Sequence, residues 1–152
     1  MSIQAIPAGY ASVTPYLMVA GAAKAIDFYK SVFGATERMR MELPEGRIAH
    51  AEIEINGSVI MLADECPESV SQGPFTTGGT PVSFHLYVPD CDGVFGRALA
   101  AGATQIRPLA NQFYGDRSGL LADPFGHIWN VATHVEDVSA QEMQRRMAAA
   151  RK

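Results

Sequence analysis

Apolar and polar residues alternate along several short stretches of this chain, which is the pattern of a strand with one buried face. From residue 49 to 55 the odd positions are apolar, and His50 and Glu52 stand on even positions. From 82 to 88 the even positions are apolar, and His85 stands among the residues of the odd positions. Each stretch is therefore predicted to place apolar side chains in a core and polar side chains on the opposite face of a sheet.

The first half of the chain predicts one supersecondary unit. In residues 22–33 the apolar side chains recur with helical spacing, and Gly34 follows as a C-terminal stop. Asn56-Gly57 is a strong hairpin signal between two of the strands that follow. The predicted elements are a strand, a helix and three more strands, at residues 13–19, 22–33, 36–43, 47–55 and 58–63.

The second half repeats this unit. Residues 56–63 return as 125–132, and residues 16–19 return as 85–88, at the same offset of 69 residues. The matching strand, helix and three strands are predicted at residues 82–88, 91–101, 105–108, 119–122 and 128–134. Because such a unit cannot bury its apolar face alone, the two copies are expected to act together. The predicted fold is α+β, with two paired β-α-β-β-β modules.

These patterns divide the chain into four parts. The expected parts are a first module, a linker, a second module and a C-terminal helix, at residues 12–64, 65–81, 82–137 and 138–152. The helix is expected because Ser139 and Glu142 form a capping box at its start. The linker, which is rich in Pro, Ser, Thr and Gly, could instead be a lid, since loops of this length are often functional.

The apolar faces of both sheets should carry the helices, which leaves the polar faces to meet each other or water. Two curved sheets joined with their polar faces inward make an open half-barrel around a cleft, and a cleft is the usual shape of a small-molecule site. His50, Glu52 and His85 lie in the middle of their strands and are expected to point into it. The alternative is that the polar face is simply the solvated side of an antiparallel sheet.

Composition argues against several other classes of protein. The chain has 152 residues and a formal net charge of −4, which gives no broad electrostatic case for nucleic acid. No apolar run approaches the length that crosses a membrane, and the first residues lack the charged and apolar regions of a signal peptide. Two cysteines are too few for a disulfide framework, which favours a reducing cytoplasm.

Several motifs resemble the vicinal oxygen chelate superfamily, which holds glyoxalase I, fosfomycin-modifying transferases, extradiol dioxygenases and bleomycin-resistance proteins. One is the helix sequence AIDFYKSVFGA at residues 25–35. FYGDRSG at 113–119 followed by DPFGH at 123–127, and also IAHAE at 48–52, resemble its PhnB-like branch. The resemblance covers roughly residues 13–137, and it implies the half-barrel fold and two-fold dimers.

The resemblance also implies where a metal would be held. Metal-dependent members place a His or Gln near the start of the first strand of each module and a Glu on the last strand. Carried onto this chain, the four positions are Thr14, Met61, Ser83 and Asn130. Methionine is a soft thioether and the other three offer neutral oxygens, so none is a good ligand for the usual divalent metals. No metal cofactor is therefore expected at these positions.

Two functions stay open at this point. In the first, the chain binds or sequesters a small molecule in the cleft without a metal. In the second, it is a metal-dependent lyase, isomerase or dioxygenase whose ligands are His50, Glu52 and His85, a set of two histidines and one carboxylate. The metal content of protein purified without chelator would distinguish the two.

Other side chains could contribute to ligand binding. Arg117 could hold an anion through a bidentate contact, although a pairing with Asp116 or Asp123 is the ordinary alternative. Tyr16 and Tyr114 could stack on a planar ligand or serve only in packing. The expected partners are a small-molecule ligand and a second copy of the chain, in a homodimer whose modules could exchange through the long linker.

Overall fold

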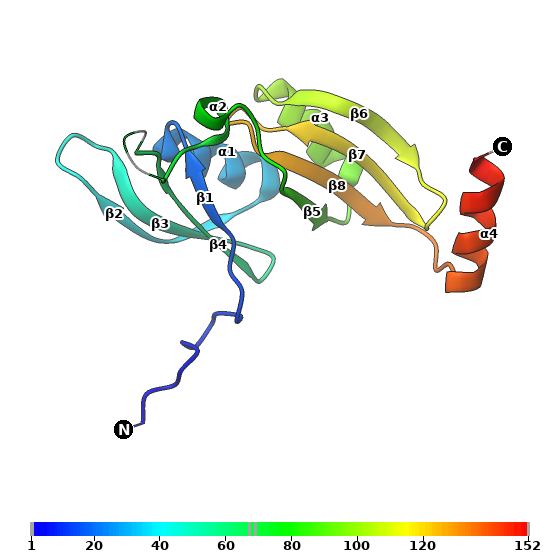
Figure 1. The fold of residues 1–152 in the computed structure, drawn as a ribbon, viewed down its shortest axis with the longest axis horizontal. Coiled ribbons are helices and arrows are strands. Elements are labelled where there is room, and N and C mark those ends of the chain that lie inside the picture. Colours follow the sequence, from blue (N-terminus) through cyan, green and yellow to red (C-terminus); the bar gives the residue numbers. More distant parts are fainter. Residues whose placement is uncertain (1, 67, 69, 152) are drawn as a thin grey trace. The chain divides into compact units, whose positions relative to one another are not determined.

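The computed structural model describes residues 2–66, 68 and 70–151, and the chain forms two compact units, residues 1–79 and 80–152. The first unit contains β1 (Tyr16–Val19), α1 (Ala22–Phe33), β2 (Thr36–Glu42), β3 (Ile48–Ile55), β4 (Ser58–Asp64) and the short α2 (Pro74–Thr77). The second contains β5 (Ser83–Tyr87), α3 (Cys91–Ala100), β6 (Thr104–Asn111), β7 (Asp116–Ala122), β8 (Ile128–His134) and α4 (Ala140–Ala150). Both units contain the predicted β-α-β-β-β order, which confirms the α+β class and the two modules (Figure 1).

The first sheet has the strand order β1-β4-β3-β2, with β1 parallel to β4 and the other neighbours antiparallel. Helix α1 packs against one face of this sheet, as Figure 1 shows. Ala51, Ile53 and Leu62 are fully buried, as are Ile26 and Tyr29 of the helix. The predicted alternation of β3 is therefore confirmed for Ala51, Ile53 and Ile55, with His50 and Glu52 on the opposite face. It is wrong at the start of the strand, where Ala49 is exposed and Ile48 is buried.

The second sheet repeats the first, in the order β5-β8-β7-β6 with β5 parallel to β8. Helix α3 packs against its apolar face. Trp129 and Val131 of β8 are buried there, and the ring of Phe84 lies 4.8 Å from that of Trp129. His85, the neighbour of Phe84 in β5, points to the other face, as the alternation predicted, because it pairs with Asn130 across the strands.

Each module fixes the start of its helix with a side chain from its last strand. In the first, Asp64 Oδ1 accepts hydrogen bonds from the backbone N–H groups of Gly21 and Ala22, at 2.9 Å each. In the second, Thr133 Oγ1 accepts from the N–H of Cys91 at 2.9 Å. Asp64 and Thr133 are separated by the repeat offset of 69 residues. The two modules therefore bind the first N–H groups of their helices from the same position of the repeat. These bonds satisfy N–H groups that a helix leaves unpaired at its start.

Two strands of the second module are longer than the sequence predicted. Strand β6 was expected at 105–108 but continues to Asn111. Pro108 lies inside it and is tolerated because β6 is an edge strand with a register irregularity between Arg107 and Ala110. Strand β7 was expected at 119–122 but begins at Asp116, in a segment between Gly115 and Gly119 that was expected to be a loop.

The segment expected as a linker contains helix α2, and Glu65 holds the residues around it. The carboxylate of Glu65 accepts from the N–H of Gly73 at 2.7 Å and from the hydroxyl of Thr76. Residues 67 and 69 of this segment, and residue 152 of the expected C-terminal helix, lie outside the described residues.

Helix α4 ends the described chain. Ser139 is its N-cap, because its side chain accepts from the N–H of Glu142 at 3.1 Å. Arg146 ties the helix to the second module through bonds to the carboxylate of Glu136 and to the carbonyl of Phe113. Among the described residues, no helix is both long enough and apolar enough to span a membrane.

Candidate functional site

A buried carboxylate lies at the centre of the polar face of the first sheet. Glu52 is only 4% exposed, although it belongs to a residue type that is almost never fully buried unless paired. It accepts hydrogen bonds from the hydroxyl of Tyr10 and from His50 Nε2, the latter at 2.9 Å. The guanidinium of Arg38 approaches it at 3.9 Å and lies over the ring of Tyr10. These partners stabilise the charged form of Glu52 inside the protein.

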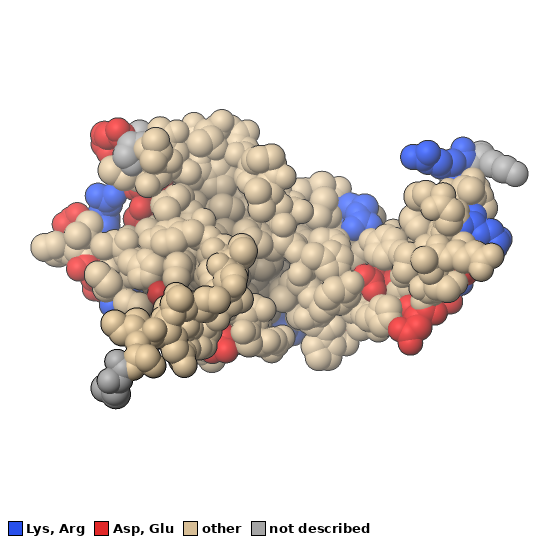
Figure 2. Space-filling view, turned by 60° about the horizontal axis from the view of Figure 1, so that its bottom comes forward, with Lys and Arg blue, Asp and Glu red and all other residues tan. Residues whose placement is uncertain are grey.

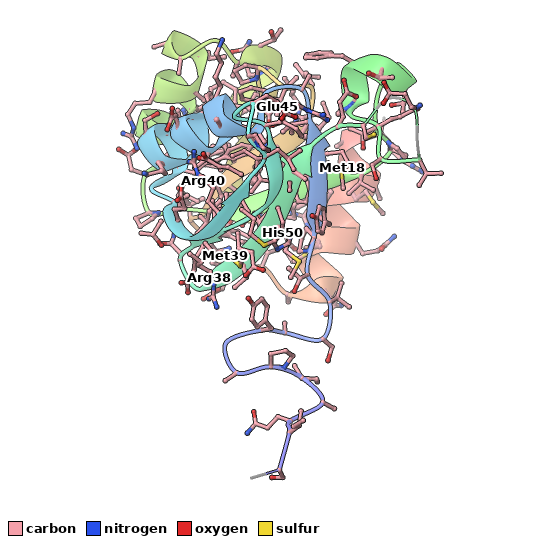
Figure 3. The ribbon with its side chains drawn as sticks, turned by 90° about the vertical axis from the view of Figure 1, so that its left-hand side faces the viewer. Met18, Arg38, Met39, Arg40, Glu45 and His50 are labelled. Atoms are coloured by element: carbon pink, nitrogen blue, oxygen red, sulfur yellow. The ribbon has the colours of Figure 1, made fainter. Side chains whose placement is uncertain are left out.

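The hydrogen bonds continue from Glu52 to a half-exposed tyrosine. His50 Nδ1 lies 2.7 Å from the hydroxyl of Tyr16, so His50 bridges Tyr16 of β1 and Glu52 of β3. In Figure 3, His50 and Arg38 come from the neighbouring strands β3 and β2, and Met18 lies on β1. The structure thus brings together Tyr16, His50 and Glu52, which the sequence had proposed as site residues.

The environment of these groups sets their protonation. Burial raises the pKa of the Glu52 carboxyl, but the bonds from Tyr10 and His50 and the charge of Arg38 lower it more, and the net pKa lies below its ordinary value. Burial, with the nearby charge of Glu52, raises the pKa of Tyr16. At neutral pH the site therefore holds a carboxylate at one end and a protonated phenol at the other.

Beside this series of residues lies a pocket of about 310 Å³, within the usual size range of small-molecule sites. Its lining residues are Tyr16, Met18, Leu43, Arg47, Ile48, Ala49, Ala63, Asp64, Cys66 and Ser71. Most of them are apolar or aromatic. Both carboxylate oxygens of Asp64 already accept hydrogen bonds from the backbone. Its Oδ1 accepts from the N–H groups of Gly21 and Ala22, and its Oδ2 accepts from the N–H of Ile48 at 2.7 Å. The positive charge of the lining is the guanidinium of Arg47, whose side chain is 48% exposed. It donates to the carbonyl of Glu65 at 2.9 Å and lies 3.9 Å from the carboxylate of Glu45.

The second module also buries a carboxylate on its polar face. Asp116 is 3% exposed. Its Oδ2 accepts from the hydroxyl of Tyr87 at 2.7 Å, and its Oδ1 lies 2.8 Å from His134 Nδ1. His85 Nε2 lies 3.7 Å from the same carboxylate. Each module thus bonds a buried acid to a tyrosine and a histidine, Tyr10 and His50 in the first and Tyr87 and His134 in the second.

Further polar contacts extend this second cluster. His85 Nδ1 lies 2.7 Å from Asn130 Nδ2, and Arg107 donates to Asn130 Oδ1 at 2.9 Å. Burial raises the pKa of Asp116, but the bonds from His134 and Tyr87 lower it more, so its net pKa lies below the ordinary value. Hydrogen bonds to Asp116 and to Asp137 raise the pKa of His134.

Of the other proposed site residues, Asn130 belongs to the second cluster, and Met61 lies between its register partners Tyr16 and Glu52 in the first sheet. Arg117 and Tyr114 are not gathered in these clusters. Arg117 lies in β7 rather than in a loop, and it donates to Asp92 of α3 at 2.9 Å instead of pairing with Asp116 or Asp123. Tyr114 is half-buried, with its ring edge-on to Phe113. Three positions carried over from the family are half-buried, at Thr14, Met61 and Asn130, and Ser83 is exposed.

The predicted site did not include six polar residues of the clusters, namely Tyr10, Arg38, Tyr87, Arg107, Asp116 and His134. Tyr10 precedes the first predicted strand, where no periodicity assigns a face. Arg107 stands beside Pro108, which had ended its predicted strand. Arg38 lies at a register irregularity of β2, beside Met39, which is the partner of Glu52 in β3. Its guanidinium reaches Glu52 at 3.9 Å through this irregularity, which simple strand alternation does not predict.

The metal ligand positions implied by the family do not fit a metal in this chain. Thr14, Met61, Ser83 and Asn130 supply a thioether and neutral oxygens, and Asn130 is already bonded to His85 and Arg107. Within the described ranges, no group of three or more His, Cys, Asp or Glu side chains is arranged to hold a metal ion. Both ring nitrogens of His50 are also occupied, by Tyr16 and Glu52.

Charged side chains of both signs lie on the face that Figure 2 shows. Figure 2 shows Lys and Arg at several separate places on one face, with Asp and Glu between them. The two arginines of α4 are paired with acids, since Arg145 and Arg146 both bond Glu142. This mixture gives no continuous basic stripe on the face shown.

Comparisons with known proteins place the chain in a family. A sequence model of the family described as the Glyoxalase/Bleomycin resistance protein/Dioxygenase superfamily matches residues 10–131. An uncharacterised protein of Mycobacterium bovis is 44% identical over 152 residues, which cover 98% of this chain and 97% of the relative. This chain therefore belongs to the glyoxalase/bleomycin resistance protein/dioxygenase superfamily, as its motifs predicted.

Solved structures agree with this assignment. TioX from Micromonospora sp. ML1 is 26% identical with a TM-score of 0.62, and the match covers 85% of this chain and 100% of that one. The PhnB protein from Bacillus cereus is 23% identical with a TM-score of 0.65, covering 81% of this chain and 99% of that one, a likeness of fold alone. PhnB-like proteins are thus among the structural neighbours, which confirms the predicted resemblance.

Proposed function

We propose that this protein binds a small organic molecule on the polar face of its first module, and that binding does not need the metal of its superfamily. The observation that carries the proposal is the pocket of about 310 Å³ beside the hydrogen-bonded series Tyr16–His50–Glu52. An apolar pocket with a few convergent polar groups and perturbed pKa values is the usual form of a ligand site.

The lining residues define the chemistry of the ligand. Tyr16 and Met18 offer an aromatic ring and a polarisable thioether, both of which favour flat or apolar groups. Leu43 and Ile48 add aliphatic surface. Arg47 supplies a positive charge at the same pocket, and guanidinium groups bind carboxylates well. A small, partly apolar anion is the ligand that fits these groups.

Filling the pocket should abolish binding. Ala49 is exposed and lines the pocket, so Ala49→Trp adds an indole there without displacing a core side chain. A fragment library of aromatic and aliphatic carboxylic acids, screened by saturation-transfer NMR, should yield fragments that bind the wild type and not this variant.

The matched control is Ala110→Trp, which adds the same side chain at an exposed position of β6, outside the lining of the pocket. This control should bind the same fragments as the wild type. Fragments that bind Ala49→Trp as well as the wild type, or no binding fragment at all, would contradict the proposed function.

We also propose that the protein is a homodimer. Each sheet has two edge strands, β1 and β2 in one and β5 and β6 in the other, and unpaired strand edges favour association. Two-fold pairing is the commonest arrangement of soluble oligomers. Light scattering at micromolar concentration should give twice the chain mass of 16.3 kDa, and the mass of one chain would contradict the dimer.

A further inference from the structure

The series Tyr16–His50–Glu52 has the layout of a proton relay that opens at a pocket. Tyr16 lines the pocket, His50 joins Tyr16 to Glu52 through its two nitrogens, and Glu52 is buried at the far end. We propose that the first module catalyses the keto–enol proton shift of small 2-oxo acids, with Tyr16 as the catalytic residue that exchanges protons with the substrate. This inference rests on the pocket of the proposed function.

The proton can be followed through the relay without any other reactant. In the starting state the phenol of Tyr16 donates to His50 Nδ1, and His50 Nε2–H donates to the carboxylate of Glu52. The C–H bond next to the ketone breaks as its proton passes to the Tyr16 oxygen and the phenol proton passes to His50 Nδ1. The products of this step are the substrate enolate and a His50 imidazolium beside Glu52.

The second step returns the proton to a different atom. His50 Nδ1 gives its proton back to Tyr16, and Tyr16 gives the phenol proton to the oxygen of the enolate. The enol is formed and the relay returns to its starting state, so the reaction consumes no oxidant, reductant or water. A positioned acid–base group of this kind contributes a factor of about 10²–10⁴ to a rate.

His50 and Glu52 act as positioning residues in this scheme. The imidazolium appears next to a carboxylate that is 4% exposed and held by Tyr10 and Arg38, so little reorganisation is needed when the charge forms. The distances of 2.7 Å from Tyr16 to His50 and 2.9 Å from His50 to Glu52 are within hydrogen-bond range.

The pocket lining selects the substrate class. A 2-oxo acid carries a carboxylate that takes the place of the exposed Glu45 carboxylate, 3.9 Å from Arg47. An apolar side group suits Met18, Leu43 and Ile48. Asp64 does not oppose the anion strongly, because three backbone N–H groups already bond its two oxygens. Phenylpyruvate combines these features, since it has a carboxylate, a flat ring and an acidic C–H bond between them.

The test is the rate at which the protein interconverts the enol and keto forms of phenylpyruvate, followed by the ultraviolet absorbance of the enol. Wild-type protein should accelerate the reaction, and Tyr16→Phe should lower kcat by about 100-fold or more with KM changed less than about twofold. The matched control Tyr87→Phe removes a hydroxyl from the other buried carboxylate, Asp116, and should keep the wild-type rate.

Glu52→Gln tests the relay separately from folding. It should lower kcat by about tenfold or more while KM stays within about twofold, because the neutral amide cannot balance the imidazolium. A merely structural role would change KM and the melting temperature and would leave kcat of the folded fraction unchanged, and that result would overturn the relay.

Binding of phenylpyruvate without acceleration would overturn the proposed catalysis and leave the binding function standing. Absence of phenylpyruvate binding, in a protein that binds other fragments in the pocket, would overturn the substrate class. Absence of any fragment binding would overturn the proposed function itself. Saturation-transfer NMR on the same preparations separates these outcomes.

Discussion

Replacing Asp123 by alanine should lower the free energy of unfolding by about 3 kcal/mol or more, the sum expected when several buried donors lose a charged partner. Asp123 is 3% exposed. Its Oδ1 accepts from the N–H groups of Phe125 and His127, at 2.9 and 3.0 Å, and its Oδ2 accepts from Trp129 Nε1 at 2.9 Å. One carboxylate therefore fixes both the turn before β8 and the largest side chain of the second core.

Urea denaturation measures this loss, and Asp92→Ala is the control. Asp92 is an exposed carboxylate of the same module that pairs with Arg117, and its removal should cost less than about 1 kcal/mol. A loss below about 1 kcal/mol for Asp123→Ala would show that other groups hold the turn.

Gly115→Ala should destabilise the second module by about 3 kcal/mol or more, because it combines backbone strain with a clash. Gly115 has a φ of 100°, which side chains rarely adopt, and an added Cβ would lie 2.1 Å from the carbonyl oxygen of Glu136. The carbonyl of Gly115 also accepts from the N–H groups of Val135 and Glu136, so the backbone cannot simply move away.

Gly46→Ala separates the two contributions. Gly46 has a similar φ of 88°, but nothing lies within 4 Å of the added Cβ. Its replacement should cost only the backbone strain, about 1–2 kcal/mol. Equal losses for the two variants in chemical denaturation would show that the clash at Gly115 is relieved by local movement.

The sequence predicted the fold well because its strongest signals are local. Alternation assigned the two faces of β3 and β5, and burial of Ala51 and Ile53 on one side and the placement of His85 on the other follow from it. The repeat offset predicted a second module of the same order, and the cap residues Asp64 and Thr133 keep that offset in three dimensions.

The strand ends in the second module were harder to predict. Proline usually ends a strand because it has no N–H group to donate to a neighbouring strand. Pro108 is tolerated because it lies in an edge strand, at a register irregularity where no hydrogen bond between strands is lost. Asp116 and Ser118 lie between Gly115 and Gly119, which had indicated a loop, whereas the structure buries both in β7. Their partners, Tyr87 and Arg107, come from other strands, and local sequence patterns do not show such pairings.

The polar faces of the two modules are less alike than their backbones. Glu52 pairs with Met61 in the first sheet, and the matching pair in the second is Leu120 with Asn130. The second module therefore carries its buried acid elsewhere, at the start of β7. The repeat predicts the scaffold, but the chemistry of each face depends on side chains that the repeat does not conserve.

Metal-independent binding is tested most directly on protein purified without chelator, by elemental analysis and by fragment titration before and after dialysis against EDTA. We predict no stoichiometric metal and unchanged fragment affinity after dialysis. One Zn, Ni, Fe or Mn per chain, lost on His85→Ala, together with loss of binding after EDTA, would contradict this and indicate an enzyme that uses His50, Glu52 and His85.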